Sequence, residues 1–208
     1  MKIVCISVGE LQSNSYILYD EVYKEAIIFD CGDEPEKISD YIEKHNLNLK
    51  YIILTHGHFD HIMAASELKL KYPDAKLGIH ADEEKFLSDK TLSLSDFVPY
   101  SVKIPAADFT FENNDKITTG TNTFTVIHTP GHTLGSCCFL CEDILISGDT
   151  LFKQSIGRCD FPTGSMPKIE NSIVNILYKL NDNTKVYPGH GEPTTIGYEK
   201  KNNCFFRI

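Results

Sequence analysis

The stretch that decides what kind of protein this is reads Tyr51-Ile52-Ile53-Leu54-Thr55-His56-Gly57-His58-Phe59-Asp60-His61-Ile62. Its first four residues are apolar and predict a strand that is buried on both faces. The seven residues that follow them carry three imidazoles and one carboxylate. Neutral imidazole is the commonest metal ligand in proteins, and carboxylate suits the harder divalent ions. The stretch therefore predicts a central strand followed by a metal-binding loop, with Asp60 where a helix begins.

The composition is that of an acidic globular protein. With 208 residues, 41% of them hydrophobic and 24% charged, the chain is predicted to form a single domain over residues 1–208. A net charge of -9 without a cluster of Lys and Arg argues against a nucleic-acid partner. No apolar run approaches the roughly 20 residues of a membrane span, and none near the N-terminus forms a signal-peptide core. We therefore expect no membrane contact and a cytoplasmic location.

The periodicity of the apolar residues predicts a mixed α/β chain. We expect strands at 2–8, 15–19, 26–29, 51–54, 76–80, 123–128, 136–140, 144–147 and 185–187. We expect helices at 34–46, 60–71, 81–87 and 166–180. The first three strands are predicted to form an antiparallel meander, and the later alternation of strand and helix predicts a partly parallel sheet. Residues 88–107 are expected to form a surface loop or lid, and 192–203 a polar tail.

Seven cysteines are expected to be reduced and buried. Cys138 and Cys141 match the CxxC pattern, but residues three apart on a strand point to opposite faces. They are therefore not expected to share a metal unless Cys141 lies in a turn. His80 lies at the end of an expected strand without ligand partners nearby in the sequence, and is predicted to be structural.

Four expected strands end at a potential ligand that lies next to glycine or close to one. These residues are His56, His132, Asp149 and His190. Ligands that follow several strands of one sheet would meet at a shared edge. Together with the loop after the central strand they supply seven donors: His56, His58, Asp60, His61, His132, Asp149 and His190.

Seven donors exceed what one catalytic zinc uses, which is about three. They fit two ions that share one ligand, and a carboxylate bridges two metals better than an imidazole does. That leaves Asp149 or Asp60 as the bridge. Paired ions about 3.5–4 Å apart activate water and clamp the attacked group, so hydrolysis is the simplest reaction. No GxSxG nucleophile motif offers an alternative route.

These residues lie in motifs that resemble those of the metallo-β-lactamase-fold hydrolases. The motifs are Thr55–His61, Thr129–Thr133, Gly148–Thr150 and Pro188–Gly191. The stretches Ser155–Ser165 and Thr194–Glu199 resemble the short glyoxalase II-like branch, which is the hydroxyacylglutathione hydrolase-like branch. The resemblance implies a four-layer αββα sandwich with the metals at one edge of the sheets.

The resemblance also implies a role for each ligand. His56, His58 and His132 would hold one ion, Asp60, His61 and His190 the second, and Asp149 would bridge them. Asp30 resembles a carboxylate that supports a ligand without binding metal itself. Asp60 and Asp149 would be the catalytic carboxylates, with Asp60 orienting the attacking group. Arg158 would contact the substrate, the alternative being a salt bridge with Asp160.

The implied cofactors are two divalent metal ions, with zinc expected and iron or manganese also suited to the donor set. The implied partner is a small-molecule thioester, cleaved by attack of a metal-bound hydroxide, in a monomer or small homo-oligomer. Full-length glyoxalase II carries a further helical region with glutathione contacts, for which the 208 residues leave no room, so the thiol carrier stays open.

Two other activities on this fold stay open. Persulfide dioxygenases use a single iron, and their signature overlaps Gly157–Phe161. Lactonases and β-lactamases are the other option. The β-lactamases usually lack an aspartate in the bridging role, so Asp149 counts against that reading.

Overall fold

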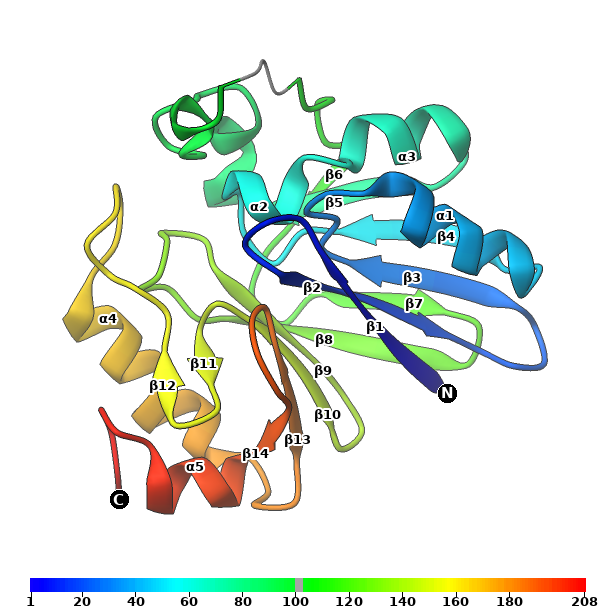
Figure 1. Ribbon diagram of the computed structural model, residues 1–208. Helices are drawn as coiled ribbons and strands as arrows, with labels where there is room; N and C mark the ends of the chain where they lie inside the picture. The colour runs from blue at the N-terminus through cyan, green and yellow to red at the C-terminus, as the bar shows by residue number, and fades with distance from the viewer. Residues whose placement is uncertain (100–102) are drawn as a thin grey trace.

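The computed structural model describes residues 1–99 and 103–208 as two facing sheets with helices outside both (Figure 1). The first sheet has the strand order β1 (Lys2–Val8), β2 (Ser13–Tyr19), β3 (Glu25–Phe29), β4 (Asn48–Ile53), β5 (Lys76–His80), β6 (Phe109–Phe111). The second has the order β14 (Thr194–Thr195), β13 (Lys185–Pro188), β10 (Ile144–Gly148), β9 (Cys137–Cys141), β8 (Asn122–His128), β7 (Lys116–Thr119). A small third sheet pairs β11 (Leu151–Phe152) with β12 (Ser155–Ile156).

Strand direction changes within each sheet. β1, β2 and β3 form the expected antiparallel meander, and β3 to β6 are parallel. In the second sheet β7 to β10 are antiparallel, and β13 runs parallel to β10. Parallel neighbours need crossover connections, which α1 (Pro35–Lys44) and α3 (Ala65–Lys71) supply in the first sheet. The partly parallel sheet predicted from the sequence is confirmed.

Three apolar clusters hold the layers together. Between the sheets, the Phe29 ring lies 5.0 Å from that of Phe124 and 4.9 Å from that of Phe139, all three fully buried. The outer face of the first sheet is covered by α1 and α3, and that of the second by α4 (Met166–Glu170) and α5 (Ile196–Asn202) (Figure 1). This helix-sheet-sheet-helix order is the αββα sandwich that the resemblance in the sequence motifs implies.

Several element boundaries differ from the predictions. The expected helix 60–71 is interrupted, as α2 (Phe59–Ile62) and then α3. The expected helix 166–180 is helical from Met166 to Lys179 but changes hydrogen-bond pattern, from α4 to the π-helix η3 (Asn171–Ile176) and the 3₁₀ turn η4 (Leu177–Lys179). Ile169, Ile173 and Leu177 are all fully buried, so the apolar face is continuous although the winding is not. The spacing of apolar residues predicted which face of the helix is buried, but it could not predict the change in hydrogen-bond pattern.

Other elements were not predicted at all. β6 and β7 are short strands, and α5 replaces most of the polar tail expected at 192–203. The Thr195 hydroxyl accepts a hydrogen bond from the Tyr198 N–H at the start of α5, and Ile196 is fully buried. By contrast, the short helix predicted at 81–87 is present, as the 3₁₀ segment η1 (Ala81–Leu87). The loop expected at 88–107 contains η2 (Ser95–Phe97), and its residues 100–102 lie outside the described part.

The cysteines follow the prediction in part. All seven are free, but Cys5 and Cys204 are exposed, so the expectation that they are all buried is wrong. Cys5 lies in the edge strand β1 and Cys204 follows α5, so neither is enclosed between the layers of the sandwich. Cys138 packs against the helix layer, whereas Cys141 faces the space between the sheets, as their spacing on a strand predicts. None of the helices in the described ranges is long and apolar enough to cross a membrane.

Candidate metal centre

The seven candidate donors meet at one edge of the sandwich because the strands that precede them end there. The loop after β4 carries His56, and the loop after β8 carries His132. Asp149 directly follows β10, and His190 comes two residues after β13, which runs parallel to β10. Parallel strands present their carboxyl ends at the same edge, so ligands from four segments of the chain reach one centre.

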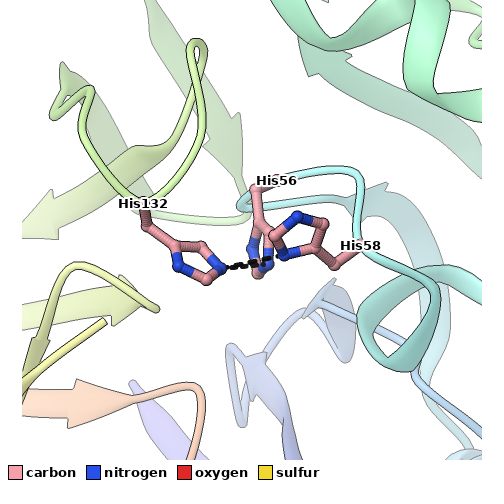
Figure 2. Close-up of side chains that lie close together, drawn as sticks. All are labelled: His56, His58 and His132. Atoms are coloured by element: carbon pink, nitrogen blue, oxygen red, sulfur yellow. Dashed lines mark hydrogen bonds between the residues drawn. The ribbon is translucent and has the colours of Figure 1, made fainter. Parts of the chain in front are cut away.

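Three imidazoles form the first cluster, drawn in Figure 2. Nε2 of His132 lies 2.9 Å from Nδ1 of His58 and 3.2 Å from Nε2 of His56. Two zinc–nitrogen bonds at a tetrahedral angle would place their nitrogens about 3.3 Å apart. The spacing of cluster one (His56, His58 and His132) is thus that of ligands arranged around one ion.

A carboxylate and two imidazoles form the second cluster, made of Asp60, His61 and His190. Oδ2 of Asp60 lies 3.2 Å from Nε2 of His190 and 3.5 Å from Nε2 of His61. The two Nε2 atoms are themselves 3.2 Å apart. Cluster two therefore presents three donors at the spacing of one further ion.

Asp149 lies between the clusters. Its Oδ1 is 3.5 Å from Nε2 of His61, and its Oδ2 is 3.6 Å from Nε2 of both His132 and His190. Oδ1 is buried without a hydrogen-bond partner among the residues the structure describes, which is costly unless a cation occupies the space. The sequence left the bridge open between Asp149 and Asp60, and this geometry favours Asp149.

Four of the five histidines have their outer nitrogen hydrogen-bonded. The partners are the Thr55 hydroxyl for His56, the Asp30 carboxylate for His61, the Arg158 carbonyl for His132 and the Leu11 carbonyl for His190, at 3.1, 2.9, 2.7 and 3.1 Å. Such contacts fix the ring and its tautomer, and each leaves Nε2 aimed at the centre. The donor set and its supports fit two divalent ions.

Asp30 is the carboxylate that the sequence placed beside the ligands, and the structure puts it there. Its Oδ1 accepts the Thr55 N–H at 2.7 Å, while Oδ2 accepts the Thr55 hydroxyl at 2.8 Å and contacts His61 Nδ1. Its backbone φ of 58° lies in the left-handed region, which is unfavourable for a residue with a side chain. Strain of this kind is kept where the surroundings require it, as at a functional centre.

Burial keeps the imidazoles of cluster one neutral. Desolvation, together with the neighbouring histidines, lowers the pKa of His56 well below its usual value. Burial and the His132 ring lower the pKa of His58 to about 2, and burial lowers the pKa of His132. A metal ligand must be the neutral ring, so these three are prepared for a cation at neutral pH.

Cluster two has the opposite balance. Burial alone would lower the pKa of His61, but three surrounding carboxylates outweigh it and raise that pKa to about 10. Burial likewise opposes protonation of His190, while its hydrogen bond to Asp60 and the charge of Asp149 raise its pKa. Burial would raise the pKa of Asp60, yet the two histidines hold it below its usual range. Before an ion binds, cluster two holds protons.

Two glycines let the chain pass close to the ligands. A methyl group at Gly189 would overlap Asp149 Oδ1 and approach His61 Cε1 to 2.8 Å. Gly148 has a φ of +47°, and a methyl group there would lie 2.5 Å from the Thr55 hydroxyl. These two glycines beside strand ends thus have a steric reason.

Glu83 is a residue that the sequence did not single out. It is fully buried in η1, and its two oxygens accept the Gly57 N–H at 2.9 Å and the Gly135 N–H at 2.8 Å. Gly57 separates two ligands of cluster one, and Gly135 follows the third. Burial raises the pKa of Glu83 to about 7. This carboxylate joins the two loops that carry cluster one, and an acid in a short polar segment gives no sequence signal of such a role.

Arg158 lies beside the centre but is paired. Its guanidinium donates to both carboxylate oxygens of Asp160, at 2.9 and 2.7 Å, and lies 4.1 Å from the centroid of the Phe161 ring. The pair is largely exposed. The structure therefore shows the salt bridge that the sequence offered as the alternative role, and the substrate role stays a prediction.

A cavity of about 380 Å³ opens next to Asp60. Most of its walls are apolar, and its charged residues are Glu10, Asp33 and Asp60. No Lys or Arg belongs to this lining within the described ranges. The cavity therefore places an apolar surface with a negative rim beside cluster two.

An αββα sandwich with two clusters of metal donors at one edge is typical of metal-dependent enzymes. Comparison with known proteins identifies the family. Residues 8–190 match the model of the metallo-beta-lactamase superfamily, and the chain belongs to this family. Together with the His and Asp clusters, membership in this family indicates a metal-dependent hydrolase.

Three similar proteins bear on the finer function. Hydroxyacylglutathione hydrolase GloC of Haemophilus influenzae is 36% identical, over 99% of this chain and 98% of that protein. The crystal structure of BLEG-1 B3 metallo-beta-lactamase is 38% identical with a TM-score of 0.93, over 98% of this chain and 99% of the other. The crystal structure of TTHA1623 in a di-iron-bound form is 31% identical with a TM-score of 0.84, over 98% and 100%.

Proposed function

We propose that this protein is a dinuclear metallo-hydrolase that cleaves small thioesters. The observation that carries the proposal is Asp149, whose carboxylate lies within 3.6 Å of His132 in cluster one and of His61 and His190 in cluster two. Similarity to GloC over nearly the whole of both chains supports a thioester as the substrate class. Zinc is proposed as the metal, and the di-iron form of TTHA1623 supports iron as the next candidate.

The ions, when bound, would supply Lewis acidity that polarises a carbonyl and makes water acidic near neutral pH. The chain itself supplies position and charge. Asp149 and the imidazoles are donors held in place to bind the ions. The imidazoles of cluster one are buried and neutral, so no proton competes with a cation there. Asp60 lies at the wall of the cavity, where its carboxylate would accept a hydrogen bond from the attacking water and orient it.

The cavity beside Asp60 bears on the group that the substrate places there. Val8, Phe59 and Val98 offer apolar contacts, whereas Glu10 and Asp33 would repel an anion. Glutathione carries net negative charge, and this lining offers it no cation. We therefore propose that an apolar part of the thioester, rather than a glutathionyl carboxylate, occupies this cavity.

The test is metal quantification on purified protein together with a substrate panel. The panel contains an apolar acyl thioester, a glutathione thioester, a lactone and glutathione persulfide. We expect about two divalent ions per chain, with kcat/KM highest for the thioesters and higher for the apolar one. One iron per chain, with sulfite formed from the persulfide, would instead identify a persulfide dioxygenase.

β-Lactam hydrolysis is a second candidate, favoured by the 38% identity to BLEG-1 B3 metallo-beta-lactamase. A chromogenic cephalosporin added to the same panel separates the two. Turnover of the cephalosporin with a kcat/KM above that of every thioester would replace the thioester proposal. The two-ion count would be unaffected, so the centre and the substrate class are tested separately.

A further inference from the structure

A second group of potential metal ligands lies outside the seven donors. It consists of His80 at the end of β5, Asp82 in η1 and His128 at the end of β8, with one donor atom of each within 4.8 Å of the others. No potential ligand lies near His80 in the sequence, which predicts a structural role for it. In the fold, the second sheet brings His128 against His80.

The three side chains of the group differ in how exposed they are to solvent. The two imidazole rings are stacked, with centroids 4.3 Å apart and planes at 15°. Asp82 Oδ2 lies 3.8 Å from His80 Nδ1. His80 is only 5% exposed, His128 is half-buried, and the Asp82 side chain is exposed. One side of the group is therefore fixed in the protein and the other is open to water.

One ring has a free lone pair, and the other has a lone pair engaged only in a long hydrogen bond. His128 Nε2 donates to the Leu134 carbonyl at 3.0 Å, which in the neutral ring leaves the lone pair of Nδ1 free. His80 Nδ1 accepts the Asp82 N–H at 3.2 Å, a long bond that an ion could replace. Burial and the neighbouring His128 lower the pKa of His80, so its ring is neutral at physiological pH. Neutral imidazole is the form that binds metal.

The chain also leaves room beside the ligand nitrogen. A methyl group at Gly135 would lie 2.9 Å from His80 Nδ1 and 3.2 Å from the Asp82 Cβ. Any side chain at this position would crowd the donor atom. The loop that follows His132 thus passes the group at a glycine, as the loops around the main centre do.

We propose that His80, Asp82 and His128 form a peripheral site for one transition-metal ion of the zinc, nickel or copper class. Two imidazoles and a carboxylate suit these ions, whereas magnesium and calcium prefer oxygen donors throughout. Tetrahedral zinc needs donors about 3.3 Å apart, whereas these donors lie up to 4.8 Å apart, so they must move closer together. Because each lone pair lies in its ring plane, the His128 ring must also turn out of its stack with His80 to face the ion. The exposed Asp82 and the half-buried His128 have the freedom to make this movement, and water completes the coordination.

The site would connect the two sheets near the main centre. His80 and Asp82 belong to the first sheet and its connection, and His128 belongs to the second. Glu83 follows Asp82 directly and holds the Gly57 and Gly135 N–H groups of the cluster one loops. An ion here would therefore hold η1 against both loops, and it would raise the stability of the folded state by mass action.

The test is equilibrium dialysis of the metal-loaded protein against Zn²⁺ alone, with metal counted per chain. The wild type should bind one equivalent more than His128→Ala, and Asp82→Asn should bind the extra ion more weakly. The matched control is His45→Ala, since His45 is also half-buried and lies against an aromatic ring, that of Tyr41. Added Zn²⁺ should raise the Tm of the wild type and of His45→Ala, but not that of His128→Ala.

Equal zinc binding by the wild type and His128→Ala would overturn the proposal, as would loss of the extra equivalent in His45→Ala. His80→Asn is a weaker probe because the ring is buried and its loss could unfold the protein. Asp82→Asn and His128→Ala change side chains with access to water, so they keep the test decisive. Asp149→Asn should retain the peripheral equivalent, which separates this site from the main centre.

Discussion

The two clusters of the metal centre use similar side chains in contrasting surroundings. Cluster one consists of three buried imidazoles whose pKa values are all lowered. Cluster two has Asp60 in place of one imidazole, borders the cavity, and contains His190 with its side chain 27% exposed. Its two histidines have raised pKa values because carboxylates surround them. One cluster is closed and uncharged, and the other is open and acidic.

The difference separates two tasks that a dinuclear centre must perform. Cluster one offers a fixed set of neutral donors, supported by Glu83 behind its loops. The carboxylates in and around cluster two attract a cation once its histidines release their protons, and its exposure gives a substrate access. We therefore expect the two ions to differ in affinity, in proton release and in sensitivity to mutation, with Asp149 as the group on which both depend.

Asp149→Asn should have the largest effect, because it removes the charge shared by both clusters. We expect metal content to fall and turnover to drop by roughly 10²–10³-fold or more, the cost of losing one charge-stabilising group at an active centre. Metal analysis and kcat measure the two effects. Asp143→Asn is the matched control, since Asp143 is exposed and pairs only loosely with Lys185 at 3.8 Å. Near-wild-type activity in Asp149→Asn would refute the bridging role.

Asp30→Asn should separate the clusters. The Asp30 carboxylate holds the outer nitrogen of His61, so its loss should weaken the second ion by about 10–100-fold. Cluster one keeps its own donors and should retain its ion. A competition titration with a chelator measures the two affinities. Equal weakening of both ions would show that Asp30 acts on the whole centre, through Thr55, rather than on cluster two.

The pH dependence of metal binding should also differ between the clusters. In the metal-free protein, His61 with a pKa of about 10 is protonated at neutral pH, and an ion must displace that proton. Affinity at cluster two should therefore fall as pH is lowered, by up to about tenfold per pH unit for each proton released. Cluster one, whose pKa values lie below the usual range, should show no such dependence near pH 7. Calorimetry in buffers of different ionisation enthalpy counts the protons, and equal release from both ions would contradict this contrast.

Glu83→Gln should act on cluster one. Glutamine has one carbonyl oxygen, so either the Gly57 or the Gly135 N–H loses its acceptor. An unsatisfied buried group costs about 1–3 kcal/mol, which denaturant unfolding measures. Glu84→Gln is the control, since this neighbour in η1 is exposed. An unchanged free energy of unfolding in Glu83→Gln would show that the two loops hold their places without this link.

The sequence predicted the main centre well because its ligands carry local signals. Three histidines and an acid in one short loop, and a glycine beside each later ligand, are visible without a structure. Glu83 and the group around His80 carry no such signal. Their partners come from the opposite sheet or a distant loop, so only the packing of the two layers brings them together. The same holds for the fold. Long segments with periodic apolar residues were predicted from the sequence. The elements β6, β7 and α5 were missed because their burial depends on contacts with other elements and not on a local pattern of apolar residues.

Arg158→Ala should have the smallest effect and tests whether the exposed guanidinium beside cluster one recognises substrate. The guanidinium is held by Asp160 and lies over Phe161, outside the donor set. If it binds an anionic thioester, KM should rise modestly with kcat unchanged, as for loss of binding that is equal in ground and transition states. Arg207→Ala near the C-terminus is the matched control. Asp160→Ala frees the guanidinium and should shift KM the other way. A KM that stays constant in both variants would assign Arg158 to its salt bridge alone, and would leave the apolar cavity beside cluster two as the surface that selects the substrate.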